Sequence, residues 1–283
     1  MMAEIIDGKK VSEHIRSQIA EGVDKLKQET GITPGLAAVL VGDDPASEIY
    51  VRNKRRACSN AGIYSEEHNL SSETTEEELL TLVDKLNNDP KIHGILVQLP
   101  LPDHINVTKV LRAVSPLKDV DGFHPYNVGL LVEGNPRFIP CTPHGIIKML
   151  EFYNIDISGK QAVIVGRSNI VGKPVSMLLL HRHATVTVCH SRTKPLDEVT
   201  RRADILVAAI GRANFITADM VKEGAVVIDV GINRNEEGKL TGDVDFEAVS
   251  QKASYITPVP GGVGPMTISM LLWNTLQSAK STS

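Results

Sequence analysis

A tyrosine and a lysine four residues apart, Tyr50 and Lys54, could act together on one ligand. No proline or glycine stands between Pro45 and Gly62, which predicts a helix over this stretch. Side chains at this spacing leave the same face of a helix, one turn apart. A phenol beside an amine can relay a proton, and a flat ring can stack on a flat ligand. Because most such pairs are only solvated surface, the pair by itself favours a surface role.

Polar side chains also occur where predicted strands end. Gln98 stands near the exit of the apolar run Gly94–Leu99, and a buried amide there needs a partner. That partner is either the neighbouring backbone or an amine or ligand heteroatom. Asp119 and Asp121 lie in a loop before Gly122, an arrangement that most often makes a turn. One of the two carboxylates could instead bind an aminopyrimidine edge. No further oxygen ligands follow, so we predict no metal site.

A glycine-rich turn in the second half predicts a phosphate cradle. The strand-like run Gln161–Val165 leads into Gly166–Pro174 (GRSNIVGKP) and then a helix to about Leu180. In a strand–turn–helix unit, backbone N–H groups and the helix dipole face an anion. The spacing is G-x-S-x-x-x-G rather than G-x-G-x-x-G, so the prediction rests on this context more than on the motif.

The next predicted strand, Thr185–Cys189, distinguishes two nicotinamide cofactors. An NAD site places an acid about 20 residues past the first glycine, on the ribose 2′-hydroxyl. Here the strand runs into His190–Thr193, with no acid before Asp197. Arg167 in the first turn and Arg192 after the second strand suit a 2′-phosphate. We therefore predict NADP over NAD; the alternative is that both guanidiniums are exposed and unpaired.

An elaborate loop precedes the last predicted helix. Pro258–Pro265 (PVPGGVGP) has three glycines and three prolines, which makes it stiff yet sterically bare. Such a loop suits close backbone approach to a flat ligand. We expect the following helix, Met266–Gln277, to pack on the first domain. Asp229 and Asp243 are predicted to bond local backbone and receive no chemistry.

The elements that position these groups alternate between strands and helices. The predicted helices are Val11–Lys27, Thr75–Asn87 and Thr142–Tyr153, and the further strands are Gly35–Gly42, Tyr64–Leu70, Asp204–Ile210, Ala225–Val230 and Ser254–Thr257. Repeated β-α-β units imply parallel sheets covered by helices, with ligands beyond the carboxyl ends of the strands. The predicted fold is α/β: two three-layer domains, the second Rossmann-like, with a cleft between them. We expect one domain at 1–140, completed by helix 265–283, and a cofactor domain at 141–264.

Composition excludes several classes of partner. A chain of 283 residues suits about two domains. A net charge of −4 without a basic block argues against nucleic acid and anionic membranes. No apolar run approaches the ~20 residues that span a bilayer. Three unpatterned cysteines suit a reducing compartment, and the acidic N-terminal residues are unlike a signal peptide, so we expect a cytoplasmic protein.

Taken together, five motifs resemble one family. They are Tyr50-x-x-x-Lys54, Val97–Pro102 (VQLPLP), Lys118–Gly122 (KDVDG), Gly166–Pro174 and Pro258–Thr267 (PVPGGVGPMT). In order and spacing, over nearly the whole chain, they resemble the bifunctional methylenetetrahydrofolate dehydrogenase/methenyltetrahydrofolate cyclohydrolase family. The ligase domain of some relatives is missing, so the chain looks like the short, two-domain bacterial type.

The resemblance implies two consecutive reactions and a homodimer formed through the cofactor domains. NADP⁺ oxidises 5,10-methylenetetrahydrofolate to the methenyl cation, which water then opens to 10-formyltetrahydrofolate. Lys54 would be the key residue of the second step, with Gln98 holding its amine and Tyr50 stacking on the folate. Asp121 would bind the amino edge of the pterin. The resemblance further implies folate contacts at Leu99, Pro260, Gly261, Gly262 and Gly264, and cofactor contacts at Gly166, Arg167, Ser168, Ser191, Arg192 and Ile232.

Two alternatives belong to other classes. Another two-domain NADP-dependent dehydrogenase, of the shikimate or amino-acid type, predicts a basic pocket for carboxylates and leaves Tyr50, Lys54 and Gln98 unexplained. A catalytically inactive nucleotide-binding protein would neither bind nor turn over folate. The joint motifs favour the folate enzyme.

Overall fold

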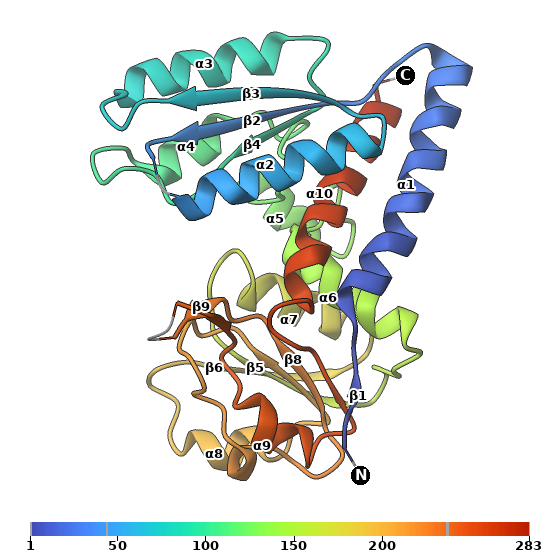
Figure 1. Ribbon diagram of the computed structural model, residues 1–283, viewed down its shortest axis with the longest axis vertical. Helices are drawn as coiled ribbons and strands as arrows, with labels where there is room; N and C mark the ends of the chain where they lie inside the picture. Colours follow the sequence, from blue (N-terminus) through green and yellow to red (C-terminus); the bar gives the residue numbers. More distant parts are fainter. Residues whose placement is uncertain (1, 44, 236–237, 283) are drawn as a thin grey trace. The chain divides into compact units, whose positions relative to one another are not determined.

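The computed structural model describes residues 2–43, 45–235 and 238–282, with the backbone alone for residues 45–50 (Figure 1). The chain divides into two compact units. We call residues 14–141 and 268–283 the three-stranded unit, and residues 1–13 and 142–267 the six-stranded unit. Each unit is therefore built from two separate stretches of chain.

The three-stranded unit is a parallel sheet with helices on both faces. Its strands are β2 (Gly35–Val41), β3 (Tyr64–Leu70) and β4 (Gly94–Val97), in the order β3-β2-β4. Both β2 and β4 are buried along their whole length, as expected of their continuous apolar sequences. The crossovers are α2 (Pro45–Asn60) and α3 (Glu76–Asn88), which lie on opposite faces of the sheet (Figure 1).

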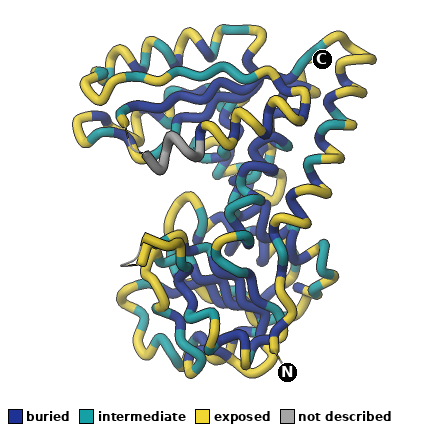
Figure 2. The backbone as a smooth tube through the Cα atoms, in the orientation of Figure 1, coloured by how far each residue is buried: buried dark blue, intermediate teal, exposed yellow. Residues whose placement is uncertain are grey.

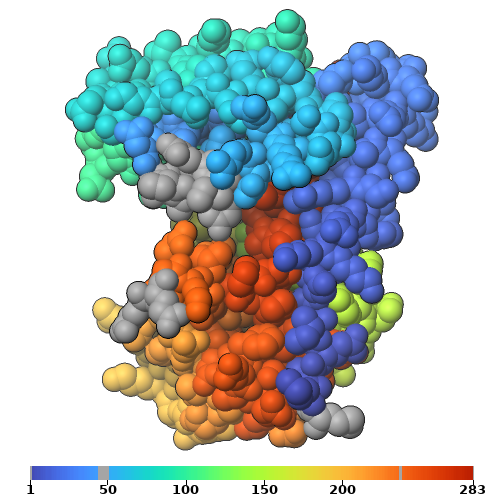
Figure 3. Space-filling model, in the orientation of Figure 1, coloured from blue at the N-terminus to red at the C-terminus, as the bar shows by residue number. Residues whose placement is uncertain are grey.

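Helices complete this unit. Leu79, Val83 and Leu86 of α3 pack in one apolar cluster with alternate residues of β2. Two short helices, α4 (Val107–Ala113) and α5 (Pro125–Val132), follow β4. Most of the long α1 (Gly8–Thr30) and of α10 (Val263–Lys280) belongs to this unit. The start of each of these two helices belongs to the six-stranded unit. Figure 3 shows the described side chains of α2 on the visible face of the three-stranded unit.

The six-stranded unit is also parallel. Its strand order is β1-β11-β8-β7-β5-β6, and Figure 2 shows the central strands as the buried part of the unit. The strands are β1 (Glu4–Ile5), β5 (Gln161–Val165), β6 (Thr185–Cys189), β7 (Ile205–Ala208), β8 (Val226–Asp229) and β11 (Tyr255–Ile256). The helices are α6 (Cys141–Phe152), α7 (Gly172–Leu180), α8 (Leu196–Thr200), η1 (Ala218–Met220) and α9 (Phe246–Ser250), and a small hairpin joins β9 (Asn233–Arg234) to β10 (Leu240–Thr241).

The predicted α/β class with two parallel sheets is confirmed. One assignment differs: the sequence analysis placed residues 1–13 in the first domain, but they belong to the six-stranded unit. The reason is that β1 pairs in parallel with β11, and Ile6 behind it is fully buried. No helix in the described part of the chain is long and apolar enough to cross a membrane.

Candidate active site

A buried lysine held by an amide forms the centre of the candidate site. Lys54 projects from α2 and is only 9% exposed. Its Nζ donates to Oε1 of Gln98 at 2.9 Å, just beyond the end of β4. Gln98 Nε2 in turn donates to the carbonyl oxygen of Leu99 at 2.7 Å, which fixes the amide with its oxygen toward the lysine. Gln98 thus has both partners considered from the sequence, the neighbouring backbone and an amine.

Burial shifts the ionisation of this lysine and of a nearby acid in opposite directions along the pH scale. Burial lowers the pKa of the Lys54 amine, while the charge of Asp121 and two neighbouring cysteines oppose part of that shift. Burial raises the pKa of the Asp121 carboxyl to about 6, and the Lys54 amine lowers it in part. Both neutral forms are therefore more accessible near neutral pH than they would be in water.

The two aspartates of the Lys118–Gly122 turn have different partners. Asp119, 4% exposed, accepts from the backbone N–H groups of Phe123 at 3.1 Å and His124 at 2.8 Å. It also accepts from Nδ2 of the buried Asn127 at 2.7 Å. The turn-forming role considered for this pair therefore holds for Asp119. Within the part of the chain that the structure describes, the hydrogen bond to Asp121 is a long one of 3.8 Å from the Cys141 thiol, which leaves most of its acceptor capacity for a ligand.

Two residues of this site were not singled out from the sequence. Cys141 is buried beside Asp121, and its Sγ also donates to the carbonyl oxygen of Val120 at 3.5 Å. Asn274 of α10 is 3% exposed and donates to the carbonyl oxygens of Val120 at 2.8 Å and Ile139 at 2.9 Å. The sequence gives no local signal for either residue, because α10 contains several other polar residues.

The structure describes several of the residues that were predicted to contact folate. The side chain of Tyr50 lies outside the described residues, although its backbone belongs to α2, one turn before Lys54. Leu99 is half-buried next to Gln98. Pro260 lies in the segment that connects β11 to α10, whereas Gly264, which was predicted to lie in the loop, is in the first turn of α10 because this helix begins at Val263 rather than at Met266. A Cβ on Gly8 would lie 1.8 Å from the carbonyl oxygen of Gly262, so α1 begins against this loop.

The glycine-rich turn lies where the sequence analysis predicted a phosphate cradle. It joins β5 to α7 in the predicted strand–turn–helix order. Gly166 has φ +129°, and a Cβ there would lie 2.1 Å from the carbonyl oxygen of Ala209. Ser168 Oγ accepts from the backbone N–H groups of Val171 at 3.1 Å and Gly172 at 3.3 Å. The serine hydroxyl therefore shapes the turn from within, and the glycine is sterically required.

The remaining predicted cofactor residues are exposed around this turn: Arg167, Ser191, Arg192 and Ile232. Neither guanidinium forms an ion pair with another described residue, so both remain available to an anion. Two exposed cations, one in the turn and one after β6, suit the phosphate groups of a dinucleotide.

Buried aspartates brace the neighbouring loops. Asp243 accepts from the backbone N–H groups of Ile210 at 2.6 Å, Gly211 at 2.9 Å and Arg212 at 2.8 Å. Asp229 accepts from the backbone N–H groups of Gly231, Asp243 and Val244 at 2.9, 2.9 and 3.0 Å. Both aspartates bond backbone, as predicted, but only the bond from Gly231 to Asp229 is local in the sequence, since the N–H groups that Asp243 accepts from lie 31 to 33 residues earlier.

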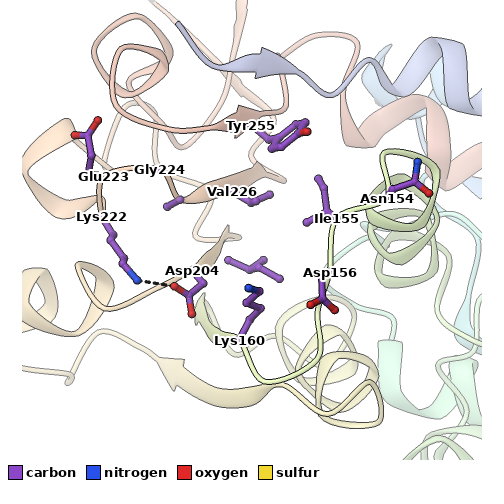
Figure 4. Close-up of a pocket in the computed structure, with 12 residues that line it drawn as sticks. Asn154, Ile155, Asp156, Lys160, Asp204, Lys222, Glu223, Gly224, Val226 and Tyr255 are labelled. Carbon is purple, nitrogen blue, oxygen red and sulfur yellow. Dashed lines mark hydrogen bonds and ion pairs between the residues drawn. The ribbon is translucent and has the colours of Figure 1, made fainter. Parts of the chain in front are cut away.

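A separate cavity of about 370 Å³ lies at the opposite, amino-terminal end of the same sheet (Figure 4). Lys222 Nζ contacts Asp204 Oδ1 at 2.6 Å, and the other oxygen of Asp204 accepts from the backbone of Gln161 at 2.8 Å. Lys222 and Asp204, two of the charged residues that line this cavity, are thus already paired with each other. Among the residues described, no group of three or more His, Cys, Asp or Glu could hold a metal ion.

Known proteins share this architecture along its entire length. A protein of Pelobacter propionicus called "Bifunctional protein FolD" is 65% identical over 99% of this chain and 98% of its own. The crystal structure of the bifunctional enzyme FolD, methylenetetrahydrofolate dehydrogenase/cyclohydrolase, from Campylobacter jejuni is 54% identical, with a TM-score of 0.97 over 99% of this chain and 100% of its own. A Trypanosoma brucei FolD structure, complexed with NADP cofactor and inhibitor, is 40% identical, with a TM-score of 0.95 over 100% and 99%.

The alternative dehydrogenase class matches only in fold. A Thermus thermophilus shikimate 5-dehydrogenase structure is 15% identical, with a TM-score of 0.54 over 88% of this chain and 100% of its own. Family models match twice: the tetrahydrofolate dehydrogenase/cyclohydrolase catalytic domain over residues 6–121, and the NAD(P)-binding domain of the same family over residues 140–283. With relatives this similar over the full chain, and with both domain models in order, the chain belongs to the tetrahydrofolate dehydrogenase/cyclohydrolase family.

Proposed function

We propose that the protein oxidises 5,10-methylenetetrahydrofolate with NADP⁺ and then hydrolyses the methenyl product to 10-formyltetrahydrofolate. The observation that carries this proposal is the buried Lys54 amine, held by Gln98 and shifted toward its neutral form. A dehydrogenase alone would not need such an amine. Family membership supplies the folate substrate and the order of the two reactions.

Hydrolysis is the step that needs a base, because the attacking water must lose a proton. Lys54 can accept that proton only as the neutral amine. Burial already lowers its pKa, and a cationic methenyl substrate alongside would favour the neutral amine further by like-charge repulsion. Gln98 presents an oxygen to the amine, so it orients one N–H and leaves the nitrogen lone pair free to turn toward water.

Hydride transfer needs no acid or base from the protein, only two rings held face to face. NADP⁺, when bound, supplies the hydride acceptor. The chain would hold it with the turn at Gly166 and Ser168, with Ser191 and Ile232 beside the turn. Arg167 and Arg192 would take the 2′-phosphate, since a guanidinium matches phosphate in a bidentate geometry.

The remaining site residues would bind the folate itself. Asp121 has little competition for its acceptors from the rest of the chain and can accept two N–H bonds from an aminopyrimidine edge. Tyr50 would stack on the flat ring system, with Leu99 beside it. The bare backbone of Pro260, Gly261, Gly262 and Gly264 would allow close approach to the folate.

We also infer a homodimer and a cytoplasmic location. Strand β6 is the open edge of the six-stranded sheet, and Val188 on it is 37% exposed. An edge of this kind is a template for pairing with a second copy.

The cysteines Cys58, Cys141 and Cys189 are all free and buried, which suits a reducing compartment. Light scattering on the purified protein tests the dimer, and cell fractionation tests the location.

The main test is one spectrophotometric assay with methylenetetrahydrofolate, run in parallel with NADP⁺ and NAD⁺. It follows the reduced cofactor and the methenyl absorbance together. We expect cofactor reduction with preference for NADP⁺, and little accumulation of the methenyl compound because it is hydrolysed. Reduction with lasting methenyl accumulation would refute the second activity; no reduction with either cofactor would refute the first.

A further inference from the structure

A single asparagine side chain ties together the two chain segments that carry Asp121 and Cys141. Asn274 lies on α10 and is 3% exposed. Its Nδ2 donates to the carbonyl oxygen of Val120, the residue before Asp121, at 2.8 Å. The same Nδ2 donates to the carbonyl oxygen of Ile139, two residues before Cys141, at 2.9 Å. An amide nitrogen has two protons, so these bonds use its full donor capacity.

The two tethered segments also meet each other. Cys141 Sγ lies 3.5 Å from the carbonyl oxygen of Val120 and 3.8 Å from Oδ1 of Asp121. Asn274 Nδ2 lies 3.9 Å from the same sulfur. The contacts therefore close a ring that runs from the amide through Val120 to Cys141. Asp121 projects from this ring with its carboxylate otherwise unused by the segments that hold it.

Packing on the other side limits how the turn could compensate. Val120 is fully buried, and a Cβ on Gly94 would lie 2.7 Å from its Cγ1. The carbonyl oxygen of Lys118 accepts from the backbone of Ile95 at 2.8 Å, which fixes the start of the turn to β4. Asp119 fixes the segment after the turn. Between these two fixed points, Asn274 holds Val120, the residue directly before Asp121.

We propose that Asn274 is a positioning residue for the folate site: it sets the place of the Asp121 carboxylate by holding Val120 and Ile139 at one separation. The proposal rests on the proposed function, because it assigns to Asn274 the geometry of a group that binds folate. An asparagine in a helix interior costs stability relative to leucine or alanine, and here the buried carbonyl groups of two loops offset that cost.

The same helix offers a matched control. Ser278 lies one turn after Asn274, and its Oγ donates to the carbonyl oxygen of Leu117 at 3.0 Å. That bond ties α10 to the same loop but ends four residues before Asp121 and does not reach the Ile139 segment. Ser278→Ala therefore removes a comparable tether without releasing Val120 from Ile139.

The test compares Asn274→Leu, Asn274→Gln and Ser278→Ala with the parent protein. Leucine keeps the branched shape of the side chain and removes both donors, whereas glutamine keeps the donors on a longer arm. For Asn274→Leu we expect kcat/KM toward folate to fall by about 10- to 100-fold in both reactions, with KM for NADP⁺ within about twofold of the parent. Asn274→Gln should recover part of the loss, and Ser278→Ala should retain the parent folate KM.

A structural role alone would give a different pattern. It would lower the melting temperature of Asn274→Leu and Ser278→Ala alike and leave the folate KM of the folded protein unchanged, and that result would overturn the proposal. If Asn274→Leu does not fold, Asn274→Ser, which keeps one donor, replaces it with the same expected split between folate KM and NADP⁺ KM. If the parent protein itself shows no folate activity, the proposed function fails instead, so the two failures are distinguishable.

Discussion

Both units bury aspartates near the ends of parallel strands, but they use them in opposite ways. In the six-stranded unit, Asp229 and Asp243 each accept at least three backbone N–H bonds and brace loops. In the three-stranded unit, Asp119 has the same bracing role, while Asp121 beside it receives one long bond from a thiol. The saturated carboxylates are part of the scaffold. The undersaturated one is available for chemistry, and it lies by a lysine whose amine is also desolvated.

The two units also differ in which functional groups they expose and which they bury. The cofactor turn relies on backbone and on exposed guanidiniums, and its buried groups are structural. The proposed folate site has instead two groups, Lys54 and Asp121, whose pKa values are displaced by burial. Binding a phosphate needs donors in fixed places, whereas proton transfer needs a group whose ionisation has been moved. The predictions below test this division, starting from the largest expected effect.

Lys54→Met should separate the two activities. We expect cyclohydrolase activity to fall by about 10²–10⁴-fold, the usual range for loss of a positioned base, while measurable hydride transfer remains. The methenyl absorbance would then accumulate during the coupled assay. Lys118→Met is the matched control, because burial also lowers the pKa of Lys118 but its Nζ donates to the carbonyl oxygens of Leu86 and Asp89. That variant should lose stability and keep hydrolysis.

The same assignment fixes the sign of a pH effect. If the neutral Lys54 amine is the base, hydrolysis should become faster as pH rises through its lowered pKa and level off above it. The parent protein is measured with preformed methenyl substrate and corrected for the rate without enzyme. A corrected rate that falls over this range, or Lys54→Met with full hydrolysis, would remove Lys54 from the role.

Asp121→Asn and Asp243→Asn should have opposite phenotypes. Asp121→Asn loses charge-assisted bonds to the ligand, each worth about 1.5–3 kcal/mol, so folate kcat/KM should fall by at least about tenfold with little change in melting temperature. Asp243→Asn places an NH₂ group among backbone donors and should lower the free energy of unfolding by about 1–3 kcal/mol. Folate KM should stay near the parent value in that variant. Similar stability losses in both variants would contradict the comparison.

Arg192→Ala should weaken the binding of NADP⁺ and leave the binding of NAD⁺ nearly unchanged. Removal of one guanidinium from a 2′-phosphate should raise KM for NADP⁺ by about tenfold or more and change KM for NAD⁺ by less than about twofold. Arg202→Ala, at another exposed arginine of the same unit, is the control. Equal changes for the two cofactors would show that Arg192 does not read the phosphate.

The last prediction concerns a histidine outside both sites and tests stability alone. Burial lowers the pKa of His144 to about 4, and its Nδ1 is buried without a partner among the described residues. Since the unfolded chain binds this proton near pH 6.5, His144 contributes stability above pH 6.5 that is lost as pH falls toward 4. Between pH 6.5 and 4, the free energy of unfolding should therefore fall less in His144→Leu than in the parent, by up to about 3 kcal/mol. Urea titrations at several pH values measure this difference. His181→Leu, at an exposed histidine, should follow the parent.

Elements and sites were predictable from the sequence to different degrees. The apolar run of β2 and the strand–turn–helix around Gly166 are local patterns, and both were found. Strand β1 was not predicted, because a two-residue strand has no periodicity and depends on pairing with β11. The helices α4, α5, α8 and α9 are also too short for a clear period.

The candidate site shows the same limit. Lys54 and Gln98 were placed together by resemblance to the family, and the bond between them is present. Cys141 and Asn274 were not found, because their importance lies in contacts across 20 and 154 residues of sequence. An isolated cysteine and a helical asparagine give no local signal of such contacts.

The division of each unit into two stretches has a consequence for synthesis on the ribosome. Residues 14–141 emerge early, but the helix that carries Asn274 is translated last. Until the tail leaves the exit tunnel, the nascent three-stranded unit therefore lacks α10 and the amide that donates to the carbonyl oxygens of Val120 and Ile139. A chain that ended between Thr267 and Trp273 would keep all five motifs of the family and lack the asparagine that holds Val120 and Ile139.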